Sequence, residues 1–227
     1  MDVAVSDNNL LPTAGRMPDR RRRQLLAMGG VALLIPSARA IAIESQPWIV
    51  SAVDQGTANL CWLASAAMMM SAAVKRSVTM GEMAEFLGDP YSQLYRQGVT
   101  APGGGALSVR DVPELARRLG LNASGFASFD VPWWVQALRF GPVMVFGIDK
   151  GGRMGHVKIL SGLDGDDSSF DGLRASGVDP NGGTQFRQPF GELIAFYERA
   201  AYFATVQVFN FGPYGTTFPM RSWPPLG

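Results

Sequence analysis

The apolar and polar positions of the first half of the chain follow the spacing of α-helices. Residues 59–75 are rich in Ala, Leu and Met without an internal helix breaker, which predicts a helix buried on most of its sides. Two further helices are expected at 80–87 and 108–119, the second with Ser108 as its N-cap. The glycine-rich stretch 98–106 between them is expected to form a surface loop.

From about residue 130 the pattern becomes that of a sheet. Asp130 is expected to cap a short helix that ends before Gly141. The apolar runs 142–148 and 155–162 are separated by a glycine-rich turn, which predicts a β-hairpin. Beyond the hairpin we expect a third strand at 170–178, a helix at 189–199 and a last strand at 201–208. Helices followed by an antiparallel sheet indicate an α+β fold, with one domain over residues 41–227.

Basic charge is concentrated in residues 1–40, which hold six arginines and three aspartates. The other 14 basic and 16 acidic residues nearly balance, so no electrostatic footprint for nucleic acid is present and no such partner is expected. Four arginines at 20–23 precede an apolar run of 11 residues at 25–35, and small residues follow at 37–40. This layout predicts an export signal, and its paired arginines are typical of the twin-arginine type.

Cleavage after Ala40 or Ala42 is expected to release the mature domain into the periplasm or the extracellular space. The apolar run is shorter than the roughly 20 residues that span a bilayer, and no second long apolar run follows. We therefore expect no stable membrane insertion after the signal is removed. A nucleic-acid-binding arm is the alternative interpretation of these arginines.

The chain has one cysteine, Cys61, and one histidine, His156. An unpaired thiol in an exported protein is either buried, linked to another chain or retained for its reactivity. A thiol attacks carbonyl groups as the thiolate, which the N-terminus of a helix and a neighbouring imidazole both stabilise. Cys61 lies in the first turn of the predicted buried helix and His156 lies on a predicted strand. The two residues are therefore a candidate nucleophile and base.

A catalytic imidazole also needs an acceptor that fixes its tautomer. Asp179 ends the strand that follows His156, so its carboxylate is expected to lie beside the imidazole across the sheet. Asn181, Asp164 and Asp171 are the alternatives for this role.

Acyl chemistry at a thiol finally requires N–H donors for a tetrahedral oxyanion. The backbone N–H of Cys61 is one expected donor, and the side-chain amide of Gln55, six residues upstream, is the second. One Cys and one His do not provide the ligands of a usual metal site, so no metal or other cofactor is expected. Ser65 and Ser71 lack the Gly-x-Ser-x-Gly setting of a serine nucleophile. The open alternative is that Cys61 is an inert core thiol.

Gln55 followed by Cys61-Trp62 at the start of an Ala- and Met-rich helix resembles the active-site region of papain-like cysteine proteases. The spacing from the glutamine to the cysteine is similar to theirs. The approach through Asn59-Leu60 departs from the papain pattern, in which other small residues precede the cysteine. The Gln and Cys-Trp motif is the most specific part of the resemblance.

The second half of the chain resembles the bacterial C39-like and C70 (AvrRpt2-type) papain-fold peptidases. Gly155-His156-Val157 opens a strand, and Asp179-Pro180 is followed by glycines. The whole resemblance spans about residues 46–185. For the C70 group it implies that the nucleophile, the base and the orienting carboxylate are Cys61, His156 and Asp179.

The resemblance implies a papain-like fold, in which a central helix with the cysteine packs on an antiparallel sheet with the histidine. It also implies a monomeric enzyme without a cofactor that hydrolyses peptide or isopeptide bonds in a protein or peptide substrate through an acyl-thioester. Amidases, deamidases and acyltransferases use the same machinery. A papain-like fold that serves as a non-catalytic binding module is the competing class.

Overall fold

The computed structural model describes residues 42–44, 47–125, 130–150, 152, 155–166, 171–201 and 206–212. The chain divides into two units, Met1–Ala38 and Arg39–Gly227, and all the described residues belong to the second. The predicted export signal at 1–40 lies outside them. None of the helices in the described part of the chain combines the length and hydropathy that a membrane crossing requires.

Six α-helices and seven strands form within the described residues. The helices are α1 (Cys61–Val74), α2 (Met80–Leu87), α3 (Tyr91–Thr100), α4 (Val112–Leu119), α5 (Val131–Leu138) and α6 (Phe190–Arg199). The strands are β1 (Ala42–Glu44), β2 (Asn122–Ser124), β3 (Val143–Gly147), β4 (His156–Asp166), β5 (Leu173–Asp179), β6 (Thr184–Pro189) and β7 (Val208–Asn210).

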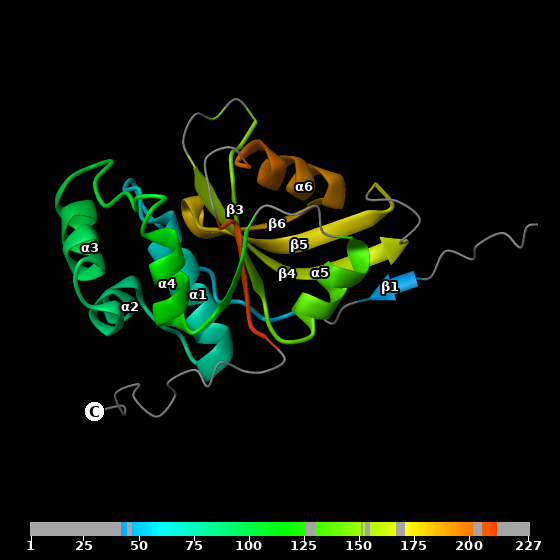
Figure 1. Cartoon of the computed structure of the whole chain (residues 1–227), viewed down its shortest axis with the longest axis horizontal. Coiled ribbons are helices and arrows are strands. Elements are labelled where there is room, and N and C mark those ends of the chain that lie inside the picture. The colour runs from blue at the N-terminus through cyan, green and yellow to red at the C-terminus, as the bar shows by residue number, and fades with distance from the viewer. Residues whose placement is uncertain are drawn as a thin grey trace, which may run out of the picture. The chain divides into compact units, whose positions relative to one another are not determined.

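All of these strands belong to one antiparallel sheet in the order β2-β7-β3-β4-β5-β6, and β1 pairs with the far end of β4. The predicted hairpin is confirmed as β3 and β4, with Gly147 opposite His156. Helices α1 to α4 gather on one side of the described part, while α5 and α6 lie with the sheet (Figure 1). The expected α+β fold with an antiparallel sheet is therefore confirmed.

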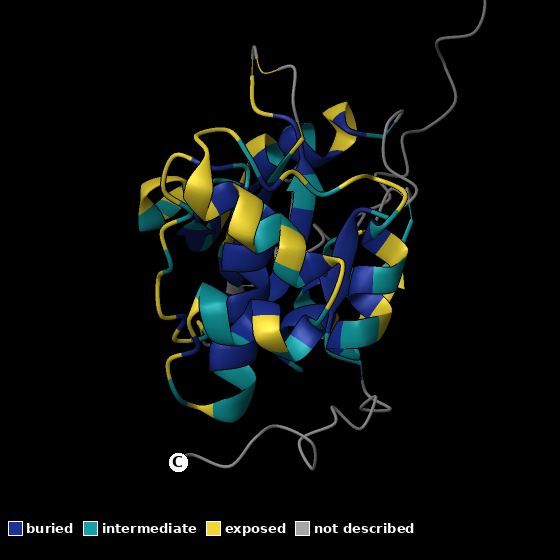
Figure 2. Ribbon diagram, turned by 90° about the vertical axis from the view of Figure 1, so that its left-hand side faces the viewer, coloured by how far each residue is buried: buried dark blue, intermediate teal, exposed yellow. Residues whose placement is uncertain are grey.

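The sheet carries a hydrophobic core on each face. In β3, Met144 contributes to the core beneath α1, whereas Val143 and Val145 contribute to the core beneath α5 and α6. This alternation is the period-two pattern of a strand buried on both sides. Every residue of α1 from Trp62 to Ser71 is buried, as its composition predicted. Figure 2 shows the buried residues in the interior and the exposed ones on the outer surfaces.

One expectation for the helical half is wrong because tertiary packing places a glycine inside a helix. The loop expected at 98–106 begins within α3, and the irregular segment follows Thr100. Gly98 faces Leu60, and a Cβ there would lie 2.7 Å from the Leu60 Cδ1. The contact with a neighbouring segment, which composition does not reveal, requires glycine at this helical position.

The predicted start of α4 is also wrong. The helix begins at Val112, and Ser108 instead accepts a hydrogen bond from the backbone N–H of Arg110 in a turn. Asp111 is the N-cap residue but makes no side-chain cap bond, and Pro113 occupies the first turn. Proline is well suited to that position because its missing N–H has no helical acceptor there.

Some strands of the second half of the chain differ from the predicted ones in their bounds or were not predicted. β4 extends beyond the run expected at 155–162 and continues through Asp164–Asp166, because β5 and β1 supply backbone partners on both sides. β6 was not expected, since its polar sequence has no apolar run. The last described strand lies at 208–210, where it pairs with β3 and β2, and residues 202–205 of the strand expected at 201–208 lie outside the described residues.

Candidate active site

Cys61 is the first residue of α1 and is only partly buried, between the fully packed side chains of Leu60 and Trp62. Leu60 is the N-cap residue and provides no side-chain cap bond. The N–H groups at the start of a helix favour an anion, so the thiol lies where a thiolate is stabilised. The rest of the helix is held in the core, which fixes the position of this end.

A glycine-rich segment, residues 103–105, holds the approach to Cys61. The backbone N–H of Asn59 donates to the Gly104 carbonyl at 2.9 Å, and its side-chain amide donates to the Gly103 carbonyl at 2.6 Å. The Trp62 indole N–H donates to the Gly105 carbonyl at 2.9 Å. These bonds fix the residues on both sides of the thiol to a segment more than 40 positions away.

His156 begins β4 and Asp179 ends β5, and the structure brings their side chains together. The imidazole Nε2 lies 2.7 Å from Asp179 Oδ1. The same oxygen accepts the backbone N–H of Asn181 at 2.9 Å. Because Nε2 is engaged with the carboxylate, Nδ1 is the ring nitrogen left for a second partner. This is the arrangement in which an aspartate fixes the tautomer and the plane of an imidazole.

Charge at the site favours a protonated imidazole. Burial disfavours the imidazolium, but hydrogen bonds to Asp179 and to the Cys61 sulfur outweigh it and raise the pKa of His156 to about 9. Burial likewise disfavours the Asp179 carboxylate. Hydrogen bonds from His156 and from the Asn181 N–H, with the charge of Lys158, nevertheless lower the pKa of Asp179. At neutral pH the imidazolium therefore lies between Asp179 and Cys61.

Gln55 lies on the loop before α1 and is tied to the end of β5. Its backbone N–H donates to the Pro180 carbonyl at 2.9 Å, and its side-chain Nε2 donates to the Ala58 carbonyl at 2.9 Å. Asp54 next to it accepts the N–H of Gly182 at 3.1 Å. A primary amide has two N–H donors, so one remains after the bond to Ala58. The Gln55 Oε1 atom is buried and has no hydrogen-bond partner among the described residues.

The alternatives for the orienting carboxylate lie elsewhere. Asp164 lies near the far end of β4, where it pairs with Arg187 of β6. Asp171 is exposed in the turn before β5. Asn181 contributes its backbone N–H to Asp179 instead of a side-chain acceptor to the imidazole. Of the residues considered from the sequence, Asp179 is the one with a hydrogen bond to His156 in the described structure.

The described structure supports neither a serine nucleophile in α1 nor a metal site. Ser65 and Ser71 are both buried within α1, and the Ser71 hydroxyl donates to the Ala67 carbonyl. Neither serine lies at the exposed start of the helix. In the described part of the chain, no group of three or more His, Cys, Asp or Glu side chains is arranged to hold a metal ion.

Lys158 is a charged residue of this region that sequence reasoning missed. Its ammonium lies 3.3 Å from Asp179 Oδ2 and 2.7 Å from Asp149 Oδ1. Lys158 follows His156 by two positions on β4, so both side chains leave the same face of the strand. This spacing was the available signal, although a lysine on a strand is more often a solvated surface residue.

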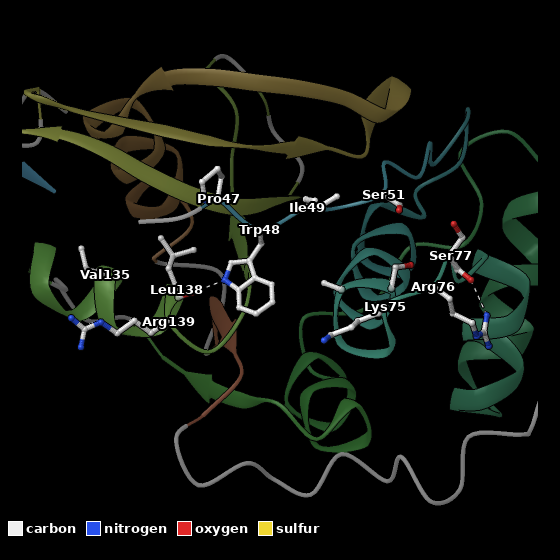
Figure 3. Close-up of a pocket in the computed structure, with 12 residues that line it drawn as sticks. Pro47, Trp48, Ile49, Ser51, Lys75, Arg76, Ser77, Val135, Leu138 and Arg139 are labelled. Atoms are coloured by element: carbon white, nitrogen blue, oxygen red, sulfur yellow. Dashed lines mark hydrogen bonds between the residues drawn. The ribbon is translucent and has the colours of Figure 1, made fainter. Parts of the chain in front are cut away.

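A groove of about 910 Å³ lies at the opposite end of α1 (Figure 3). Trp48 and Ile49 line it together with Lys75, which follows the last residue of the helix. The indole N–H of Trp48 donates to the Leu138 carbonyl at 2.6 Å. A helix of 14 residues is about 20 Å long, so this groove is separate from the Cys61 site.

A comparison with known protein families finds a match over most of the described residues. The family model described as papain-like cysteine protease AvrRpt2 matches residues 45–198. The matched stretch includes the loop with Gln55, the helix that starts at Cys61, and the two strands with His156 and Asp179. A search of curated protein sequences finds no significant match.

Replacing Gly105 is expected to disturb the approach to the thiol. Gly105 has φ +80°, and a Cβ there would lie 2.6 Å from the Leu60 Cδ2 and 2.8 Å from the Leu94 carbonyl oxygen. Gly105→Ala should lose about 2–4 kcal/mol of unfolding free energy, from left-handed backbone strain together with overpacking. Urea denaturation measures this loss.

Gly103→Ala is the matched control, because Gly103 has φ +72° but no atom within 4 Å of a Cβ. This variant should lose only the backbone contribution, about 1–2 kcal/mol. Equal losses in the two variants would contradict the packing argument.

The pKa of His156 is expected to depend on both of its hydrogen-bond partners, Asp179 and Cys61. Because the chain has one histidine, a protein without a histidine tag gives a single imidazole signal in NMR. We expect a pKa near 9 in the wild type and a lower pKa in both Cys61→Ala and Asp179→Asn, since each partner raises it. A wild-type pKa at or below the ordinary 6.5 would contradict this prediction.

The same shift predicts how stability depends on pH. The folded-state pKa exceeds the unfolded one, so between about 6.5 and about 9 the folded protein retains a proton that the unfolded chain releases. The contribution of His156 to stability is therefore complete below about 6.5 and is lost as the pH rises through about 9. Urea denaturation across this range, with Cys61→Ala as the control, measures it.

Proposed function

Because the chain belongs to the family of papain-like cysteine proteases represented by AvrRpt2, we propose that it hydrolyses peptide or isopeptide bonds through an acyl-thioester intermediate. The observation that supports this most directly is the bond of 2.7 Å between the single histidine and Asp179. Together with Cys61 at a helix N-terminus, it supplies the groups that acyl transfer requires. A protein or peptide is the proposed substrate.

In the acylation step, the Cys61 sulfur attacks the carbonyl carbon of the scissile bond. The carbonyl oxygen becomes an oxyanion, for which the backbone N–H of Cys61 and the free amide N–H of Gln55 are the proposed donors. As the tetrahedral intermediate collapses, the C–N bond breaks and the His156 imidazolium gives its proton to the departing amine. The products of this step are a free amine and a thioester on Cys61.

In the deacylation step, the neutral imidazole of His156 takes a proton from a water molecule, whose oxygen attacks the thioester carbon. The C–S bond then breaks, which releases a carboxylic acid and returns Cys61 and His156 to their starting state. Asp179 accepts a hydrogen bond from the Nε2–H group throughout, so it keeps Nδ1 directed at the reacting atoms and stabilises the imidazolium. The negative charge of Asp179 stabilises the site most when the imidazole carries its extra proton, which is before proton transfer in acylation and after it in deacylation.

We further propose that the mature domain, about residues 41–227, acts outside the cytoplasm after export through a twin-arginine-type signal at 1–40. The support is the sequence alone: the arginines at 20–23, the short apolar run that follows and the small residues before Ala40.

Substitutions at the site are expected to separate the proposed roles. Incubation with a peptide library, with cleavage products identified by mass spectrometry, supplies a substrate for kinetics. Cys61→Ala should abolish turnover while leaving the fold intact, because no other nucleophile occupies the helix start. Asp179→Asn should lower kcat/KM by about 10- to 10³-fold, or about 1.4–4 kcal/mol of transition-state stabilisation.

Asp164→Asn is the matched control, since this carboxylate belongs to the surface pair with Arg187 and should be nearly neutral. Undiminished hydrolysis by Cys61→Ala would exclude the proposed nucleophile. A wild-type protein that cleaves no peptide, yet is labelled at Cys61 by a thiol-directed probe in a way that His156→Ala abolishes, would favour a deamidase or acyltransferase. Absence of both cleavage and labelling would favour a non-catalytic binding protein.

Export is expected to depend on the arginine pair. Replacing the arginines at 20–23 with lysines preserves charge but removes the side chain that twin-arginine export recognises. The fraction of protein recovered outside the cytoplasm should fall nearly to zero. Unchanged export would contradict the twin-arginine assignment and point to the general secretory route.

A further inference from the structure

The Asp179 carboxylate lies between two cations instead of one. Its Oδ1 is 2.7 Å from the His156 imidazole, and its Oδ2 is 3.3 Å from the Lys158 ammonium. The backbone register explains this arrangement. Ile159 pairs with Val178 across β4 and β5, and continuing the register by one pair sets Lys158 opposite Asp179. The lysine is thus the direct cross-strand neighbour of Asp179, and His156 is its diagonal neighbour.

Lys158 is held in this place by contacts on its other sides. The Asp149 carboxylate lies 2.7 Å from the ammonium, and the Phe196 ring lies beneath it at 4.7 Å to the ring centroid. The same ring meets the His156 imidazole edge-on, with ring centroids 6.4 Å apart. Only 13% of the Lys158 side chain is exposed. An ammonium that is paired twice and stacked on a ring, at the end of a largely enclosed side chain, is fixed in position, unlike a solvated surface lysine.

We propose that Lys158 is a positioning residue for the reaction: its ammonium anchors Oδ2 of Asp179 and shares the charge of the carboxylate with His156. This inference rests on the proposed function for its kinetic consequence, but the arrangement of charges can be tested without any activity. Anchoring Oδ2 leaves Oδ1 as the oxygen directed at the imidazole. Sharing the charge limits how strongly the carboxylate holds the imidazolium proton.

The sharing of the Asp179 charge between Lys158 and His156 matters because His156 has to release its proton during acylation. An imidazolium held too tightly by a full carboxylate charge is a poorer acid toward the departing amine. It is also less often available as the neutral base that activates water. The interactions with Asp179 and Cys61 already raise the pKa of His156 to about 9. A carboxylate without the competing ammonium would raise it further.

The charged groups that contact the pair or Lys158 come from α1, β4, β5 and the segment after β3. Cys61 of α1 and Asp179 of β5 act on the imidazole. Lys158 of β4 acts on Asp179, and Asp149 after β3 acts on Lys158. From α6, the packed group is the uncharged Phe196 ring. Arg199 ends that helix, and its guanidinium donates to the Ile148 carbonyl at 2.7 Å.

The test follows the single histidine signal of a tag-free protein by NMR titration, in parallel with peptide hydrolysis. Lys158→Met removes the charge and keeps the length of the side chain. The pKa of His156 should rise by about 0.5–1 unit, because a cation near the pair is lost. The kcat should fall about 10-fold while KM changes by less than about 3-fold, since the lost interaction acts in the chemical steps.

Lys158→Arg keeps the cation, so the pKa of His156 should stay at its wild-type value and kcat should stay close to that of the wild type. Lys150→Met removes a charge from the exposed turn after β3 and is the matched control, with an expected change below about 0.2 units in the titration. Lys158→Gln is a second neutral variant in case the methionine variant does not fold, with folding checked by circular dichroism.

An unchanged or lowered pKa of His156 in a folded neutral variant would overturn the inference, because the ammonium would then hold none of the carboxylate charge. Failure of Lys158→Arg to restore the titration would also overturn it. These outcomes are independent of hydrolysis. A wild-type protein without peptidase activity would refute the proposed function, whereas the titration would still decide whether Lys158 controls the Asp179–His156 pair.

Discussion

The helix that begins at Cys61 is buried from Trp62 to Ser71, and its inner surface packs on one face of the sheet. A helix enclosed to this extent cannot shift without opening the main hydrophobic core, because close-packed interiors have few voids to absorb movement. Its N-terminal end is therefore fixed relative to the strands. That end carries the one partly accessible thiol, at the point where the helix favours an anion.

Three segments that are far apart in the chain meet around this end of the helix. The loop before Cys61 bonds to the glycine-rich segment 103–105 and, through Asp54 and Gln55, to the turn after β5. The contacts are made mainly by backbone groups, whose positions vary less than those of long side chains. The site therefore derives its geometry from the packing of loops onto a rigid scaffold, as is usual for catalytic groups on loops.

Charges alternate along the other half of the site. Asp149, Lys158, Asp179 and His156 follow one another as acceptor, donor, acceptor and donor, each within hydrogen-bond or ion-pair distance of the next. A buried charge is costly unless it is paired, and each internal member of this series is paired on two sides. The outermost member, Asp149, is half exposed. The series thus passes from solvent to the imidazole without leaving a buried charge unmatched.

The sequence by itself determined the elements whose pattern is local. The Ala- and Met-rich stretch predicted α1, the capped Asp130 segment predicted α5, and the apolar runs around a turn predicted the β3–β4 hairpin. It also singled out Cys61 and His156, because the chain has one thiol and one imidazole. For the orienting residue it favoured Asp179 but left Asn181, Asp164 and Asp171 open, and the register of β4 and β5 brought Asp179 to the imidazole. The tertiary structure decided the helical setting of Gly98 against Leu60, the polar edge strand β6 and the role of Lys158 as the neighbour of Asp179. These features depend on contacts between distant segments and on strand register, which fix what each side chain meets and which no local pattern contains.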